Sequence, residues 1–483
     1  MADDDTRAGS RARAVRVAPL LGLAGRTAGE AVVAALRQRR RDGDPQGVRR
    51  EFHAHTAEMW AHRLGRSRGV LMKAGQILSI VIPESALEAE YRGIYQAAFA
   101  RLLDDAPPMP PEIASRVVAT ELGADPSVVF AEFDPHPVAA ASIGQVHLAR
   151  LRDGRRVAVK VQYPGVDEAI RADLANTELL ATFLRLLVSL LPGLTKADLR
   201  AMAREVSERI SEEIDYRIEA AHQRAFADAY RGHPYIRIPE LIPELCTRRV
   251  LTMEFVDGMR YAKATAAQQR LRDLWGEVMF RFNYSSMYRL RLVHTDPHPG
   301  NYLFHEDGTV SFLDFGCVKK FHGRQLRDLS GMIFRTLDQD PDRLAKWAVA
   351  AGFVDVNDAP DPDELLAWWS DSWRYLLAPQ PFTITPDYVA RAIGNRVSAS
   401  GPLAHVGRKM MLPPDFTVGA RMDAGLVAAI GGLRAGGDWR GIVEEFDFDN
   451  PGPPSTALGE RDAEYRRTHP WPAAPVATAS PTR

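Results

Sequence analysis

The fold of this chain is decided by the segment His294-Thr295-Asp296-Pro297-His298-Pro299-Gly300-Asn301, followed downstream by Leu313-Asp314-Phe315-Gly316. Transfer of a phosphoryl group from ATP needs a carboxylate near the acceptor, oxygen ligands for Mg²⁺ and a lysine on the phosphates. The first segment supplies a carboxylate, Asp296, and an amide, Asn301, and the second supplies another carboxylate, Asp314. We therefore predict that Asp296 is the catalytic base and that Asn301 and Asp314 bind Mg²⁺.

The spacing of these residues is that of protein kinases, which carry H-R-D-x-x-x-x-N and D-F-G motifs. Between the motifs lie two short apolar runs, 301–304 and 310–313, separated by Asp307-Gly308, and this pattern predicts a β-hairpin with a tight turn. Either motif alone is a weak signal, because a Pro-rich loop and an ordinary hairpin can carry the same letters by chance. Motifs upstream decide between the two interpretations.

A second hairpin is predicted upstream, where residues 146–150 and 155–160 flank an Asp153-Gly154 turn. Its second strand ends in Val-Ala-Val-Lys, the pattern in which a kinase lysine holds the α- and β-phosphates of ATP. We therefore predict that Lys160 contacts the phosphates. The alternative, a solvent-facing lysine at a strand end, is the default for a lone lysine without this context.

A small-residue loop, Ala139-Ala140-Ala141-Ser142, precedes this hairpin. Kinases use glycines here, because glycine reaches positive φ and lets the backbone approach a phosphate. Alanines restrict that freedom, so we expect the loop to grip the triphosphate differently, with the Ser142 hydroxyl bonding a phosphate oxygen. A plain turn into the following strand is the alternative.

Two further segments complete the predicted nucleotide site. Residues 199–226 form a long helical pattern with many acidic side chains, most of which belong to a solvated face, and periodicity does not select the partner of Lys160. Residues 249–258 form an apolar strand that runs into a polar linker, as in a kinase hinge whose backbone meets adenine. Glu254 and Phe255 are the predicted contacts, although an edge strand has the same pattern.

These motifs occur in one order, together with Lys73-Ala74-Gly75-Gln76 near the start and Glu213-Ile214-Asp215 before the strand. In this combination the chain resembles the UbiB/AarF (ADCK) family of atypical protein-kinase-like proteins over residues 71–320. The resemblance implies an α+β, two-lobed protein-kinase-like fold with a helical N-terminal extension and a largely helical C-terminal lobe. It also implies ATP and Mg²⁺ as cofactors.

The resemblance assigns roles that the residues alone do not. Its implied catalytic and nucleotide-site residues are Lys73, Gln76, Glu213, Asp215 and Glu219, the last as the partner of Lys160. Read by itself, the segment 73–76 indicates a plain amphipathic helix with a surface lysine and glutamine. In the family, the alanine loop is associated with altered nucleotide choice and suppressed kinase activity.

The parts of the chain are expected in the order N-terminal arm (1–50), helical extension with the 73–76 motif (51–125), kinase-like N-lobe (126–258), C-lobe (259–445) and tail (446–483). The tail is rich in Pro, Ala, Ser and Thr without periodicity. Such a composition predicts disorder, because it offers too little apolar surface to bury.

Composition limits the partners of the chain. Lys and Arg number 61 against 62 Asp and Glu, so the basic footprint of a dedicated nucleic-acid binder is missing. The two cysteines give no metal or disulfide pattern, which suits a reducing compartment. The most apolar stretch, 179–191, is interrupted by Arg185 and is too short to span a bilayer. We expect a cytoplasmic protein without a secretory signal, in which 15–36 and 179–191 are candidates for peripheral contact with the inner face of the cell membrane.

Two departures from ordinary kinases bear on the substrate. Thr295 stands where kinases carry the arginine that receives a phosphorylated activation loop, and no Ala-Pro-Glu segment follows Asp314-Phe315-Gly316. The platform for a peptide is therefore missing. With the resemblance, this favours an ATPase or small-molecule kinase that supports isoprenoid-quinone or other lipid metabolism, with an isoprenoid lipid or quinone precursor as partner. The alternatives are a protein kinase acting in trans and a nucleotide-gated scaffold that binds lipid or enzymes with little turnover.

Overall fold

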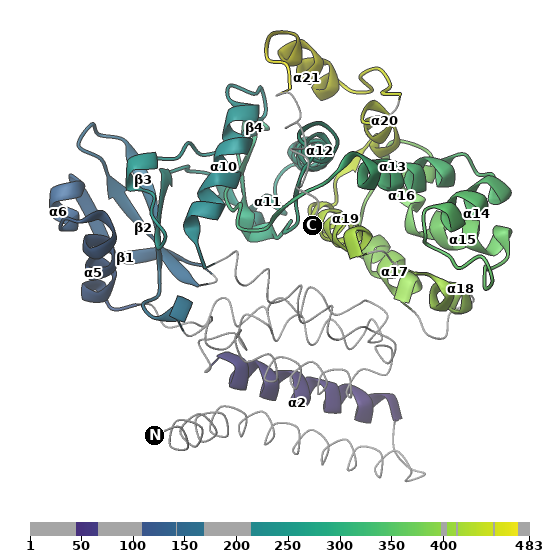
Figure 1. Ribbon diagram of the computed structural model, residues 1–483, viewed down its shortest axis with the longest axis horizontal. Coiled ribbons are helices and arrows are strands. Elements are labelled where there is room, and N and C mark those ends of the chain that lie inside the picture. Colours follow the sequence, from purple (N-terminus) through teal and green to yellow (C-terminus); the bar gives the residue numbers. More distant parts are fainter. Residues whose placement is uncertain are drawn as a thin grey trace, which may run out of the picture. The chain divides into compact units, whose positions relative to one another are not determined.

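The computed structural model describes residues 45–65, 109–141, 143–168, 214–397, 403–411, 414–447 and 450–471. Helices and strands are mixed along this part of the chain, as an α+β protein requires (Figure 1). The chain divides into two compact units, Met1–Leu148 with Lys160–Ile214 and Ala149–Val159 with Asp215–Arg483. Several predicted features lie outside the described residues, namely Lys73, Gln76, Ser142, Glu213 and the segments 15–36 and 179–191.

Three helices of the first unit are described. Helix α2 (Pro45–Gly65) comes first, and the predicted boundary between arm and extension at residue 50 falls inside it. Helix α5 (Pro111–Leu122) starts at a proline, which loses no hydrogen bond at a helix N-terminus, and ends at Gly123 with φ 74°. Both α5 and the short α6 (Pro126–Val129) pack on strand β1 (Glu132–Ala141).

The first sheet contains the predicted lysine strand. Its strand order is β1-β2-β3-β5, with β2 (Gly144–Arg150), β3 (Arg156–Gln162) and β5 (Val250–Glu254). The predicted turn between β2 and β3 is confirmed, since Gly154 has φ 91° and donates its N–H to the carbonyl of Leu151. The apolar strand predicted before the linker is β5.

The alanine segment belongs to a strand. Ala139, Ala140 and Ala141 close β1, whose side chains alternate between exposed and half-buried. The prediction of a loop over these residues is therefore wrong. A strand with alternating faces has no need of glycine, and the connection to β2 is left to residues 142 and 143.

The hairpin predicted between the two site motifs is confirmed. Strand β8 (Tyr302–Phe304) pairs antiparallel with β9 (Val310–Phe312), and Gly308 in the turn has φ 83°. The sheet has the order β4-β9-β8-β6, and β7 pairs with β10 in a separate ladder. These other strands are β4 (Ile236–Arg237), β6 (Met259–Arg260), β7 (Leu292–His294) and β10 (Val318–Lys320).

A buried helix supports this hairpin. Helix α12 (Gln269–Ser285) continues into a π-helical turn, Ser286–Leu290, and nearly all of its side chains from Trp275 onward are buried. Such a helix lies in the interior of a domain. Phe282 of α12 stacks on Phe312 of β9 with a centroid distance of 3.7 Å, so the helix packs against the hairpin that joins the two site motifs.

The second unit is otherwise largely helical. Figure 1 shows α14 and α15 side by side, and they are in contact. The described elements not yet named are α10 (Tyr216–Tyr230), the 3-10 turns Pro243–Leu245 and Pro299–Asn301, α11 (Tyr261–Ala264), α13 (Gly323–Leu337), α14 (Pro341–Ala350), α15 (Pro362–Ser372), α16 (Arg374–Leu377), β11 (Phe382–Thr383), α17 (Pro386–Val397), α18 (Ala404–Lys409), α19 (Pro414–Leu433), β12 (Gly436–Gly437), α20 (Trp439–Glu445) and α21 (Ala457–Thr468).

The last of these helices corrects the prediction of a disordered tail. Helix α21 buries Leu458, and Asp462 contacts Nε2 of the buried His233 at 2.9 Å. The Arg466 guanidinium lies over the ring of Trp471, 3.3 Å from its centroid. The prediction of disorder is therefore wrong for residues 450–471. It rests on the amino-acid composition of the tail, which contains no information on the few tertiary contacts that stabilise a short helix.

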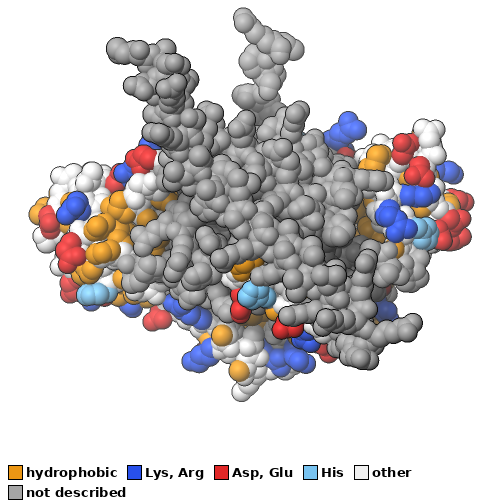
Figure 2. Space-filling view, turned by 90° about the horizontal axis from the view of Figure 1, so that it is seen from below, with side chains coloured by type: hydrophobic (Ala, Val, Ile, Leu, Met, Phe, Trp, Pro, Cys, Tyr) orange, Lys and Arg blue, Asp and Glu red, His pale blue; other side chains and the backbone are white. Residues whose placement is uncertain are grey.

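Two surface properties follow from the described residues. Among them, no helix combines the length and the apolarity needed to cross a bilayer. On the described part of the face drawn in Figure 2, acidic and basic side chains are interspersed, without a large field of either sign.

Candidate nucleotide and magnesium site

The predicted catalytic loop starts where strand β7 ends, at His294. Thr295 donates two hydrogen bonds to the carbonyl of Cys317, from its backbone N–H at 2.9 Å and from its hydroxyl at 3.1 Å. Asp296 follows and is half-buried. The residue directly before the predicted catalytic carboxylate is therefore hydrogen-bonded to the residue after the Asp-Phe-Gly motif.

Asp296 orients the side chain of Asn301. The Asn301 amide nitrogen donates to the backbone carbonyl and to Oδ2 of Asp296, each at 3.1 Å. An amide that donates through Nδ2 presents its carbonyl oxygen on the other branch of the side chain. That oxygen suits Mg²⁺, which prefers oxygen ligands and takes only one or two side chains from a protein when phosphates supply others.

Backbone contacts bring Asp314 to the same place. The N–H of Leu313 donates to the carbonyl of Asn301 at 3.0 Å. Asp314 Oδ1 accepts the N–H of Gly316 at 2.9 Å, and its carbonyl accepts a hydrogen bond from Nε2 of His294 at 2.6 Å. The predicted base and one predicted magnesium ligand, Asn301, are therefore in direct contact, and the hydrogen bond between Leu313 and Asn301 holds the residue before the other, Asp314, against them. No group of three or more His, Cys, Asp or Glu with metal-binding geometry occurs in the described residues, and a site completed by phosphates does not need one.

Helix α10 meets the Asp-Phe-Gly motif through one face. Phe315 is fully buried, with its ring 4.9 Å from that of Phe226 on α10. A methyl group at Gly316 would lie 3.6 Å from Oε2 of Glu219, so this carboxylate reaches the motif. His222 contacts the carbonyl of Phe315 through Nδ1 at 3.2 Å. Glu219 is thus the acidic residue of the described helix that lies beside the motif.

The lysine partner of Glu219 stays a prediction. Lys160 is a half-buried residue of strand β3, as the Val-Ala-Val-Lys pattern predicts. Glu219 is 5% exposed, which fits a carboxylate with a polar partner, because burying an unpaired charge is costly. The two residues belong to different units of the chain.

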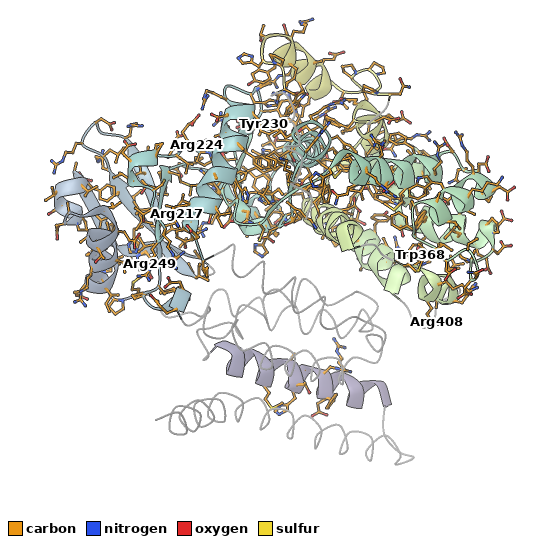
Figure 3. All side chains as sticks on the ribbon, in the orientation of Figure 1. Arg217, Arg224, Tyr230, Arg249, Trp368 and Arg408 are labelled. Carbon is orange, nitrogen blue, oxygen red and sulfur yellow. The ribbon has the colours of Figure 1, made fainter. Side chains whose placement is uncertain are left out.

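Asp215 has a local role that the sequence did not indicate. It is extended, with φ −126°, and caps α10 by accepting the N–H of Arg217 at 3.0 Å. The Arg217 guanidinium, at the N-terminal end of α10 in Figure 3, binds both carboxylate oxygens, and this hydrogen bonding lowers the pKa of Asp215. The prediction of one helix over 199–226 is therefore wrong at residues 214–215, since a helix begins after its capping residue.

The linker after β5 is already hydrogen-bonded within the protein. Glu254 donates its N–H to the carbonyl of Glu240 at 2.8 Å, and Phe255 donates its N–H to the carbonyl of Arg156 at 3.0 Å. The Phe255 ring also lies under the Arg156 guanidinium, at 4.3 Å. These two backbone N–H groups are therefore not available as donors to adenine. The backbone carbonyl oxygens of Glu254 and Phe255 are the groups of the predicted hinge that can still contact it.

Comparison with known proteins agrees with this geometry. A family model described as the ABC1 atypical kinase-like domain matches residues 101–348, which include the lysine strand, α10, the catalytic loop and the Asp-Phe-Gly motif. The chain belongs to the ABC1 atypical kinase-like family. The relatives include proteins named COQ8 and aarF domain kinases, which confirms the predicted membership of the UbiB/AarF group.

Individual relatives of this ABC1-family protein match over part of their length. It is 34% identical to the mitochondrial atypical kinase COQ8B of Rattus norvegicus over 60% of the chain and 53% of the relative. It is 34% identical to the mitochondrial atypical kinase COQ8 of Saccharomyces cerevisiae over 54% of the chain and 50% of the relative. The chain thus spans about half the length of these curated relatives.

A solved structure covers more of the ABC1-family chain. It is the complex of Rv3197 with erythromycin from Mycobacterium tuberculosis, which is 32% identical and aligns with a TM-score of 0.58 over 80% of the chain and 95% of Rv3197. Together with the family match, this shows a kinase-like fold built from mixed helices and strands.

Sequence reasoning missed several residues that hold this ABC1-family site together. His294 and His222 bind successive carbonyls of the Asp-Phe-Gly motif, and Phe226 packs against its phenylalanine. A signal was present, because residues 219, 222 and 226 recur at the spacing of one helix face. It could be read only once the start of α10 was known.

Proposed function

We propose that the chain binds ATP with Mg²⁺ and either hydrolyses it or transfers its γ-phosphoryl group to a small molecule. The assembly of Asp296, Asn301 and Asp314 by the hydrogen bond between Leu313 and Asn301 carries this proposal. Asp296 orients the acceptor or water, while Asn301 and Asp314 hold Mg²⁺. Bound Mg²⁺ would neutralise charge on the phosphates.

The remaining predicted residues complete the nucleotide site. Lys160 binds the α- and β-phosphates and Glu219 holds that lysine in line. The end of β1 and Ser142 lie over the phosphates, and the carbonyl of Glu254 accepts the adenine amino group. The side chains of the motif 73–76 contact Glu213 and Asp215 at the place where a protein kinase binds the phosphoryl acceptor.

The arrangement of parts is also proposed from the resemblance. Residues 126–258 and 259–445 form the two lobes of a kinase-like fold, and the extension 51–125 covers the place where a protein kinase receives its peptide. This favours a small acceptor over a protein. It supports an isoprenoid lipid or quinone precursor as partner, reached by peripheral contact with a membrane.

Two other functions make different predictions. A protein kinase acting in trans would have to receive a peptide without an Ala-Pro-Glu segment after the Asp-Phe-Gly motif. It would also lack the arginine that receives a phosphorylated activation loop, because Thr295 stands in that place and donates both of its hydrogen bonds to the carbonyl of Cys317. A ligand-binding scaffold with little turnover gains support from Rv3197, which was solved with erythromycin, a large and mostly apolar molecule. Erythromycin therefore belongs among the ligands to be tested.

The decisive experiment measures thermal unfolding with ATP, with and without Mg²⁺. Binding to the native state at a ligand concentration 100 times Kd stabilises it by about 2.7 kcal/mol. We expect this gain to need Mg²⁺ in the wild type and to be lost in Asp314→Asn. Asp358→Asn, which changes an exposed aspartate paired with Lys409, is the matched control and keeps the gain.

Turnover is measured on the same proteins as phosphate release, with anionic liposomes, a phenolic quinone precursor or erythromycin added in turn. We expect Asp296→Asn to lower the rate about 100-fold or more, since it removes a general base. An unchanged rate in both Asp296→Asn and Lys160→Arg contradicts the catalytic assignment. Ligand binding without phosphate release favours the scaffold.

A further inference from the structure

His222 stands out because it contacts the magnesium motif without being a ligand, a base or a core residue. It lies on α10, one turn after Glu219, and is half-buried. Its Nδ1 is 3.2 Å from the carbonyl oxygen of Phe315. A carbonyl only accepts hydrogen bonds, so the imidazole must carry its proton on Nδ1 in this contact.

The neighbouring carbonyl is held in the same way from another element. Nε2 of His294, at the end of β7, is 2.6 Å from the carbonyl of Asp314. Two successive carbonyls are thus bound by two imidazoles, one from the catalytic loop side and one from α10. Rotation of the peptide between Asp314 and Phe315 would break the hydrogen bond from His294, and rotation of the peptide between Phe315 and Gly316 would break the one from His222.

The surroundings of Phe315 add to this restraint. The ring of Phe315 packs between Phe226 of α10, at 4.9 Å, and His294, at 5.6 Å between centroids. Packing fixes where the ring lies, but it does not by itself fix the direction of the flanking carbonyls. The hydrogen bond from His222 fixes the direction of the peptide between Phe315 and Gly316. The N–H of that same peptide donates to Oδ1 of Asp314 at 2.9 Å, so holding the peptide also holds the Asp314 side chain.

We propose that His222 is a positioning residue that keeps Asp314 aimed at the magnesium position by holding the carbonyl of Phe315 to α10. This inference rests on the proposed binding of Mg²⁺ with ATP. It also couples α10 to the metal, because the helix that carries Glu219 then moves together with the Asp-Phe-Gly backbone. Loss of the hydrogen bond should weaken Mg²⁺ binding more than it weakens folding.

The test compares substitutions of His222 that keep or remove a hydrogen-bond donor for the carbonyl of Phe315. The amide nitrogen of asparagine branches from Cγ as Nδ1 of histidine does, so His222→Asn keeps a donor for Phe315. His222→Leu has nearly the shape of asparagine but no donor. His222→Gln moves the amide one methylene further away, and serves as the second comparison with asparagine if the leucine variant folds poorly.

Mg²⁺ is titrated into full-length protein at fixed ATP, and ATP is titrated separately without metal. We expect His222→Leu to weaken Mg²⁺ binding about fivefold to tenfold, the effect of losing one ordinary hydrogen bond, with metal-free ATP affinity unchanged. His222→Asn should bind Mg²⁺ as the wild type does, and His222→Gln should resemble leucine. The control is His405→Leu on α18, which removes the contact of 2.8 Å between Nε2 of His405 and Glu364 of α15, and this variant should bind Mg²⁺ as the wild type does.

The outcomes separate this inference from the function on which it rests. Equal Mg²⁺ affinity in the wild type, in His222→Leu, which lacks the donor, and in His222→Gln, in which the donor is displaced, overturns the role of His222 and leaves ATP binding standing. A parallel loss of metal-free ATP affinity and of thermal stability also overturns it, because His222 would then be merely structural. A wild type that binds no ATP with Mg²⁺ removes both proposals together.

Discussion

At the scale of single residues, hydrogen bonds from side chains to backbone carbonyls build the site. The carbonyls of residues 314, 315 and 317 accept from the side chains of His294, His222 and Thr295, respectively. Such contacts between side chains and backbone carbonyls fix the position of a loop. The carboxylates of Asp296 and Asp314 thus remain the charged groups of this loop that can serve chemistry.

The hairpin turn under the site depends on one glycine. Gly308 has φ 83°, and a methyl group there would approach Leu274 to 3.3 Å. Left-handed backbone costs other residues about 1–2 kcal/mol, so we expect Gly308→Ala to lower the free energy of unfolding by that amount. Urea unfolding measures the change.

The control for this prediction is Gly323→Ala in α13. A methyl group at Gly323 would meet nothing nearer than the end of Arg327, at 3.8 Å, and alanine favours a helix. This variant should be as stable as the wild type or more so. Equal losses in the two variants would show that φ at residue 308 is not the cause.

At the scale of elements, α10 connects the site to the rest of the second unit. Asp215 caps its first turn, and its middle carries the contacts to the Asp-Phe-Gly motif. Tyr230, labelled at its other end in Figure 3, bonds Ser285 of α12 through its hydroxyl at 2.7 Å. Fixing both ends of the helix fixes the position of Glu219 between them.

Asp215 caps α10, and the family resemblance also implies a role for it at the nucleotide site. Two substitutions separate these two roles. Asp215→Ala should cost about 1 kcal/mol of stability, whereas Asp215→Asn keeps a capping side chain and should cost little. The ion pair with Arg217 adds little, because that side chain is 65% exposed. Urea unfolding of both variants measures this difference.

Nucleotide binding by Asp215→Asn then decides the implied role. If Asp215 is only a cap, the asparagine variant binds ATP with Mg²⁺ as tightly as the wild type. Weaker binding at unchanged stability would instead support a role of the carboxylate at the nucleotide.

At the scale of the whole molecule, the C-terminal segment joins parts of the second unit that are far apart in sequence. The Tyr465 hydroxyl bonds the carbonyl of Arg231 just beyond α10, and Arg466 bonds the carbonyl of Ala229 at 2.9 Å. The fully buried Arg281 of α12 binds both oxygens of Glu445 and the hydroxyl of Thr456, which caps α21. The segment is therefore an integral part of this unit.

One contact of this segment makes stability depend on pH. Burial lowers the pKa of His233 below its usual 6.5, despite the hydrogen bond to Asp462, and Arg461 and Arg466 oppose a further positive charge. The unfolded chain therefore takes up a proton near pH 6.5 that folded His233 does not. The stability that neutral His233 contributes is present above that pH and is lost as the pH falls below it.

We expect the free energy of unfolding to decrease when the pH is lowered from about 7.5 to 5.5. His147 and His305 contribute with the same sign, since burial lowers the pKa of each. The share of His233 is the difference between the wild type and His233→Gln, which should show a shallower slope. Identical slopes in urea unfolding across this range would exclude a proton-linked role for His233.

The sequence by itself determined the two hairpins and the spacing of the residues in the predicted site. The Asp153-Gly154 and Asp307-Gly308 turns each lie between apolar runs, and glycine allows the positive φ angle that such a turn needs. Both hairpins formed where the sequence predicts them. Asp296 and Asn301 are five residues apart in the chain, so their proximity needed no tertiary information. These features depend on neighbours along the chain.

Only the tertiary structure decided which of several similar residues lie beside the Asp-Phe-Gly motif. Glu219 is one of many acidic residues in a helical pattern, and the structure shows that it lies beside Gly316, nearly a hundred residues away. The same holds for His222 and for α21, whose order depends on contacts with His233 and Trp471. Periodicity and composition describe a segment alone, whereas such contacts depend on what the folded chain brings against it.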